Sequence, residues 1–375
     1  MPLRVRLTPA RTAALVGLCL VLLSGLTAGL ARYYVGERAA RAASHLERGR
    51  MLVRAGEVER GLAELRASLA LNRGDPETAL VLATALLEAN RLHEAETYLD
   101  EAIAADPTSG PANLARARVA RALGAEETDT YYQRAYYGSW GLATLPQRVT
   151  VGFELVEYLL SRGERDRARG VLTQLAVDAG HDTGLLLRVA LLQIDAGAAS
   201  DAVPILRDVV ARRPGDGPAW SALAAAAFAL YEDQIAARAA AQALNLDKRD
   251  QQAQRIRRLA TAALEQDPRA GRLGSRERLR RAQHLVEGAA AALDRCRTAS
   301  DSAGDAAAPS RDAESTRRQV DRIMATRPPA DLDLDDLIDL ATRLWADRQD
   351  DCPVLEANLE PLARVFQRLA AGATR

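Results

Sequence analysis

The sequence predicts an all-α protein with one N-terminal transmembrane helix, a solenoid of about six helix-turn-helix repeats and a helical C-terminal module. Three observations predict this architecture. A run of 20 uncharged residues lies near the N-terminus, small and aliphatic residues recur every 34 residues through the middle of the chain, and amphipathic patterns continue beyond the repeats. Aromatic residues make up only 4% of the 375 residues, a composition that favours helices packed through small side chains.

Residues 12–31 (TAALVGLCLVLLSGLTAGLA) contain no charged side chain. As a helix this run would be about 30 Å long, which matches the hydrocarbon core of a bilayer. Arg4, Arg6 and Arg11 precede it without an acidic residue, so the positive-inside rule favours a cytoplasmic location for residues 1–11 and export of the body. We therefore predict a single-pass anchor in a bacterial inner membrane with the rest of the chain in the periplasm. The alternative is a signal peptide cleaved at residues 29–31.

Gly25 and Gly29 form a GxxxG pair inside this segment. The spacing lets two membrane helices approach closely, so it offers a weak homodimer contact. Glycine is common in membrane helices, and chance explains the pair better than dimerisation does.

Small and aliphatic residues recur with a spacing of 34 residues between positions 42 and 248. One column holds small residues at Gly49, Ala83, Ala117, Ala190 and Ala224, with the larger Val156 between them, and another holds the turn formers Gly56, Asn90, Gly124, Gly163 and Gly197. Six units start near residues 42, 76, 110, 149, 183 and 217. A unit of this length, with two helices that cross at small residues, resembles the tetratricopeptide repeat.

This resemblance implies that the first helix of each unit lines a concave surface that binds protein partners. The candidate binding residues on these helices are Leu80, Leu87, Phe153, Leu160, Leu187, Ile194 and Phe228. They lack the Lys, Asn and Arg set with which the chaperone-cofactor members of this family hold a terminal carboxylate. We therefore expect the groove to take an apolar or amphipathic segment. The alternative for any single residue is packing between repeats.

The third unit departs from the repeat pattern. Asp129 replaces its small residue, and the register slips by 5 residues through the aromatic-rich segment 131–148 (YYQRAYYGSWGLATLPQR). These aromatic side chains could form a binding surface. We favour the other interpretation, in which they fill a gap where two blocks of three repeats meet.

Beyond the repeats, the sequence predicts a helical cap at 249–297, a linker at 298–310 and a helical module at 311–375. Within the module, helices are expected at 311–326, 335–348 and 353–370. Residues 248–281 carry eleven basic and four acidic side chains, whereas residues 331–360 carry ten acidic and two basic ones. We expect these two blocks to dock on each other, because docking neutralises both. The alternative is contact of the basic block with anionic lipid head groups.

Cys296 and Cys352 are the two cysteines outside the predicted anchor. In an exported protein two free thiols are unusual, so we predict a disulfide between them. The bond would tie the acidic helices back to the basic region. The alternative is two thiols that never meet.

The sequence carries no signature of catalysis or of a cofactor. Its four histidines, His45, His93, His181 and His284, have no metal-ligand neighbour at a useful spacing. No nucleophile elbow, phosphate-binding glycine loop or Cys-x-x-Cys motif is found. We expect neither an enzyme nor a metal site, and the zero formal net charge gives no reason to expect a nucleic-acid partner.

The sequence therefore favours a membrane-tethered scaffold or assembly factor that holds protein partners of unknown identity. Two other roles remain open. One is a periplasmic chaperone-like module for exported proteins, which would bind loosely and promiscuously. The other is a non-catalytic subunit of a polysaccharide export or synthesis machine.

Overall fold

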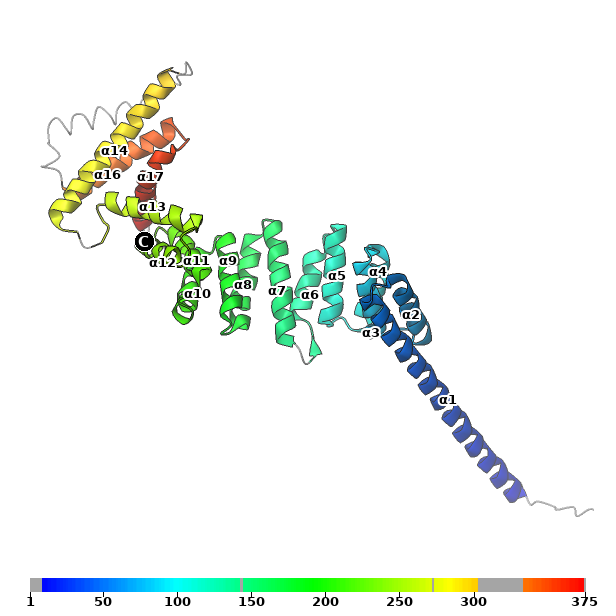
Figure 1. Ribbon diagram of the computed structural model, residues 1–375. Helices are drawn as coiled ribbons and strands as arrows, with labels where there is room; N and C mark the ends of the chain where they lie inside the picture. Colours follow the sequence, from blue (N-terminus) through cyan, green and yellow to red (C-terminus); the bar gives the residue numbers. More distant parts are fainter. Residues whose placement is uncertain (1–8, 142–143, 272, 303–332, 374–375) are drawn as a thin grey trace, which may run out of the picture. The chain divides into compact units, whose positions relative to one another are not determined.

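The computed structural model describes residues 9–141, 144–271, 273–302 and 333–373 (Figure 1). These residues form sixteen α-helices and one 3-10 helix, and no strand is present among them. The helices are α1 (Pro9–Arg54), α2 (Val58–Leu71), α3 (Pro76–Glu88), α4 (Leu92–Ala105), α5 (Gly110–Leu123), α6 (Thr128–Tyr137), α7 (Thr144–Ser161), α8 (Arg165–Ala179), α9 (Thr183–Asp195), α10 (Ala199–Arg212), α11 (Gly217–Ala229), α12 (Asp233–Leu246), α13 (Gln251–Gln266), α14 (Ser275–Ser302), α16 (Leu334–Asp351), η2 (Ala357–Leu359) and α17 (Glu360–Ala373). They divide into two compact units, Met1–Val171 and Leu172–Arg375.

Six helix pairs follow one another from the end of α1 to α12, which confirms the six predicted repeats. All five predicted turn residues have positive φ, between 58° and 82°. Glycine adopts this conformation at little cost, and asparagine tolerates it. The sixth turn holds Tyr231 at φ 59° instead, a bulky residue where the other repeats use Gly or Asn. Aspartate caps begin several first helices, as when Asp75 accepts a hydrogen bond from the Thr78 amide at 2.9 Å.

The predicted small-residue column lies where the two helices of each repeat cross, and its members are buried. The closest crossing is in the first repeat. A Cβ added at Gly49 would lie 2.7 Å from the Leu65 Cγ, and one added at Gly61 would lie 2.6 Å from the Val53 Cγ2. A larger side chain at either position would push α1 and α2 apart.

Helix α1 connects the predicted anchor to the solenoid. It runs without a break from Pro9 to Arg54, so the first helix of the first repeat continues the predicted anchor. Residues 22–41 are exposed, and Ala42 is the first residue of α1 that the structure shows buried. Wherever side chains are described, no helix has an apolar stretch long enough to cross a bilayer. The predicted anchor lies partly outside that range, because residues 12–16, 19 and 21 have no described side chain.

The aromatic segment after α5 packs into unit 1, as the favoured interpretation predicts. Tyr132 and Tyr136 are fully buried. The Trp140 indole donates a hydrogen bond to the Ala135 carbonyl at 2.9 Å and lies against Gly110, where no Cβ would fit. Tyr137 is the exception and remains exposed. These side chains fill space between helices.

The C-terminal module has its own apolar core, formed by α14, α16 and α17 with the end of α13. Trp345 and Phe366 stack in it with ring centroids 4.9 Å apart. The sequence placed two boundaries wrongly. Helix α14 continues to Ser302, into the predicted linker, and α17 begins at Glu360 because 353–356 is irregular. The rest of the predicted linker, 303–310, and the predicted helix 311–326 lie outside the described residues.

Candidate partner-binding grooves

The structure places the seven predicted groove residues in two kinds of environment. Leu80, Leu87, Leu160, Leu187, Ile194 and Phe228 are half-buried. Phe153 is only 2% exposed, so its side chain lies inside unit 1 and offers no surface to a partner. Two of the half-buried residues, Leu80 and Ile194, line grooves.

The N-terminal groove lies between α1 and α3 in unit 1 and has a volume of about 380 Å³. It is lined by Arg50, Val53, Arg54, Leu80, Val81, Thr84, Ala85 and Glu88. Its floor is apolar, and its charged residues are of both signs. Arg50 is already paired, because it donates to Glu47 at 2.8 Å and to Glu77 at 2.5 Å. These two carboxylates raise the pKa of Arg50.

The acidic groove lies in unit 2, between α9, α11 and the loop before α13, with a volume of about 590 Å³. It is lined by Leu191, Ile194, Asp195, Gly217, Pro218, Ser221, Ala222, Ala225, Ala243, Asp247, Asp250 and Gln252. Three carboxylates surround an apolar floor, and no basic residue is among these lining residues. The two grooves therefore share an apolar floor and differ in charge.

Phe228 lies 34 residues after Ile194, at the equivalent position of the next repeat, but it is covered by the C-terminal helix α17. The Arg364 guanidinium of α17 sits 3.4 Å from the centroid of the Phe228 ring and 5.1 Å from that of Tyr231. Arg364 also donates hydrogen bonds to Asp233 and to the Phe228 carbonyl. The predicted binding position at the last repeat is thus occupied by the chain itself.

The Arg364–Asp233 ion pair is buried on both sides, with side chains 7% and 1% exposed. Burial raises the pKa of Asp233 despite the nearby cation, and burial likewise lowers the pKa of Arg364. Desolvation therefore opposes the attraction of the pair. Composition and spacing gave no sign of this contact. The available signal was Tyr231, a bulky residue at a turn position that requires a left-handed backbone.

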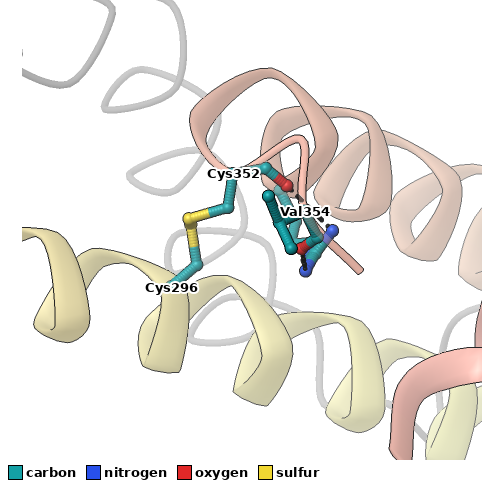
Figure 2. Close-up of a disulfide and its surroundings, with 4 residues drawn as sticks. Cys296, Cys352 and Val354 are labelled. Atoms are coloured by element: carbon teal, nitrogen blue, oxygen red, sulfur yellow. Dashed lines mark hydrogen bonds between the residues drawn. A yellow bond between two sulfur atoms is a disulfide. The ribbon is translucent and has the colours of Figure 1, made fainter. Parts of the chain in front are cut away.

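A disulfide joins Cys296 of α14 to Cys352 in the turn after α16, with a Cα–Cα distance of 6.1 Å (Figure 2). This confirms the predicted pairing. Arg348 fixes the same turn, because its guanidinium donates to the carbonyls of Cys352 at 2.9 Å and Val354 at 2.6 Å. The bond therefore links α14 covalently to the end of α16 within the C-terminal module.

The basic and acidic blocks of the tail meet, as the charge pattern predicted. Arg255 of α13 pairs with Glu360 of α17, and Arg269 pairs with Asp335 of α16 at 2.9 Å. Arg368 of α17 reaches back to Asp267. Most of these side chains are exposed, so each of the first two pairs contributes little stability.

Within the described part of the chain, no three His, Cys, Asp or Glu side chains are grouped so that they could hold a metal ion. His45 instead contacts the Glu64 carboxylate at 2.7 Å, and this contact lowers the pKa of Glu64.

The sequence profile of the tetratricopeptide repeat matches residues 52–119, from the end of α1 into α5. This stretch of the chain therefore matches the tetratricopeptide-repeat family. No curated protein matches its sequence. Among solved structures it is similar to YrrB, a tetratricopeptide-repeat protein with an unusual peptide-binding site, at 16% identity and a TM-score of 0.41, covering 52% of this chain and 97% of that one.

Two further solved structures are similar to part of the chain. PilW, a widely conserved type IV pilus biogenesis factor, is 15% identical with a TM-score of 0.39, over 57% of this chain and 97% of PilW. PilF of Pseudomonas aeruginosa is 15% identical with a TM-score of 0.40, over 59% of this chain and 99% of PilF.

Proposed function

We propose that this protein is a scaffold that binds apolar or amphipathic segments of partner proteins in the grooves formed by the first helices of its repeats. The N-terminal groove carries this proposal. Its floor combines Val53, Leu80 and Val81, which are only partly buried, and no described part of the chain covers them. An apolar groove between parallel first helices suits a helix or an extended peptide with regularly spaced apolar anchors.

We also propose that the first half of α1 tethers the scaffold to a membrane, with the repeats on the periplasmic side. Support comes from six leucines, Leu18, Leu20, Leu22, Leu23, Leu26 and Leu30, whose side chains are 48% to 63% exposed. Water does not favour so many exposed leucines on one helix, whereas lipid does. An alkaline phosphatase fusion after residue 60 should be active and a cytoplasmic reporter at the same site inactive. The reverse result contradicts the orientation.

Groove binding is tested by filling the N-terminal groove. Thr84→Arg places a long cation over the floor at a partly buried position on α3. Thr97→Arg is the matched control, because Thr97 is exposed on α4, and each threonine donates its hydroxyl to the carbonyl four residues earlier, at 2.8 Å for Thr84 and 3.2 Å for Thr97. Both variants should keep the helical content of the native chain.

The readout is affinity capture from detergent-solubilised membranes. A stoichiometric partner that is lost with Thr84→Arg and kept with Thr97→Arg supports a scaffold with a dedicated partner. Many unfolded clients, or capture that ignores both changes, would contradict it. Recovery of a glycan-synthesis complex through another surface would do the same.

A further inference from the structure

We infer that the acidic groove of unit 2 binds a partner segment that is apolar and positively charged. The inference rests on the proposed function and adds to it the chemistry of one partner. Three features of the groove carry it: an exposed apolar floor, a rim of carboxylates without basic residues, and a serine hydroxyl that can bond to a peptide backbone.

The floor offers contact area to an apolar side chain. Leu191 is 44% exposed, and Ile194 and Ala225 beside it are half-buried. Pro218, at the start of α11, is also partly exposed. Covering this surface would remove apolar area from water, which favours binding of a segment with aliphatic or aromatic anchors.

The carboxylates at the rim of the groove favour a positively charged partner. Asp247 and Asp250 each use one carboxylate oxygen locally, accepting from the amides of Arg249 at 2.8 Å and Ala253 at 2.9 Å. Asp195 forms no hydrogen bond or ion pair with any residue that the structure describes. It is the last residue of α9, where the helix dipole places partial negative charge, so an unpaired carboxylate there is unfavourable until a cation approaches.

Ser221 adds a polar contact inside the groove. Its side chain lines the groove although the residue is only 8% exposed. Its hydroxyl makes no hydrogen bond to any described residue. The hydroxyl can therefore donate to a peptide carbonyl, or accept from a peptide amide, that lies on the floor.

The N-terminal groove provides an internal comparison, because it carries Arg50 and Arg54 beside Glu88. A cationic segment gains nothing there. Preference for positive charge should therefore depend on unit 2 alone.

The test uses the full chain in detergent and three labelled amphipathic helical peptides that share one leucine pattern. Their polar positions are all Lys, all Gln or all Glu, and binding is followed by fluorescence anisotropy. The Lys peptide should bind roughly five- to tenfold more tightly than the Gln peptide at low ionic strength, with the difference shrinking as salt is added. The Glu peptide should bind most weakly.

Two variants locate the effect. Asp195→Asn with Asp247→Asn should bring the Lys and Gln peptides to equal affinity. Asp201→Asn with Asp208→Asn removes the same charge from α10, whose residues do not line the groove, and should leave the preference unchanged. Ser221→Ala should weaken all three peptides at this groove by a similar factor.

The outcomes separate the two proposals. Equal affinity for the Lys and Gln peptides, or a preference abolished equally by the α10 variant, overturns the charge-selective site while the scaffold stands. Failure of all three peptides to bind overturns the proposed function itself.

Discussion

Equivalent positions in the first and last repeats differ in exposure, because one lines an open groove and the other is covered by a later helix. Val53 of the first repeat lines an open groove together with Leu80 of the second, whereas Phe228, the equivalent of Val53 in the last repeat, lies under the Arg364 guanidinium of α17. A solenoid buries its last apolar face only by adding a cap. The contrast shows that a repeat position does not determine its own exposure, since segments later in the chain can cover it.

Removing the charge from Asp233, which pairs with Arg364, should cause the largest loss of stability. Asp233→Asn leaves Arg364 buried without a counter-ion, which should lower the free energy of unfolding by about 3–5 kcal/mol. Asp233→Leu with Arg364→Met removes both charges and should recover most of that loss, because burial disfavours both ionised groups. Chemical denaturation of the full chain measures both. A double variant as unstable as the single one would mean that the ion pair is a net attraction.

Opening the disulfide should destabilise the C-terminal module alone. The bond spans a sequence separation of 56 residues, so its loss frees about 4 kcal/mol of unfolded-chain entropy in the simple loop model. Cys296→Ser with Cys352→Ser, compared with the native pair in a Cys19→Ser background, should lower the unfolding midpoint of the module. Hydrogen exchange should rise in α16 and α17 and remain unchanged in α3 and α4. Free, alkylatable thiols in the purified protein would remove the basis of this prediction.

The first repeat should be sensitive to one added methyl group. Gly61→Ala forces a Cβ against Val53 and should cost about 1–3 kcal/mol by overpacking. Gly170→Ala is the matched control, because its Cβ meets nothing within 4 Å, and it should stabilise α8 by about 0.5–1 kcal/mol. Thermal unfolding of the two variants measures both changes in stability. Equal effects of the two changes would mean that the α1–α2 crossing is not tightly packed.

A substitution in the turn of the last repeat should change the stability least. Tyr231→Gly relieves a left-handed backbone at a bulky residue but removes the ring beside Arg364, and the two effects oppose each other. We expect a net change within about 1 kcal/mol. Faster hydrogen exchange in α17 with little change in overall stability would show that Tyr231 helps to hold α17 in place. Unchanged exchange would assign the contact to Phe228 and Asp233 alone.

Much of the fold was predictable because its determinants are local. The residues Gly56, Asn90, Gly124, Gly163 and Gly197 mark turns whatever lies around them, and small residues at helix crossings recur with the repeat. The Cys296–Cys352 pair was predictable from the cysteine count together with the expectation that the body of the chain is exported. The turn and crossing residues depend on a few neighbouring positions, so they can be recognised in a single sequence.

The environment of the groove residues was less predictable because it depends on distant segments. Phe153 and Leu80 lie at equivalent positions of their repeats, yet Phe153 is buried in unit 1 and Leu80 lines a groove. Phe228 is covered by a residue 136 positions later in the chain. The acidic rim likewise combines the end of α9 with the start of α13. No periodicity within a repeat reports such long-range contacts.

Photo-crosslinking at Thr84 and at Phe228 shows directly which of the two sites a partner protein contacts. A photoreactive phenylalanine derivative replaces Thr84 in the open groove or Phe228 under the cap, in the full chain and in native membranes. We expect a crosslink to another protein from position 84, and only an intramolecular crosslink to α17 from position 228. An intermolecular crosslink from position 228 with none from position 84 would contradict this expectation.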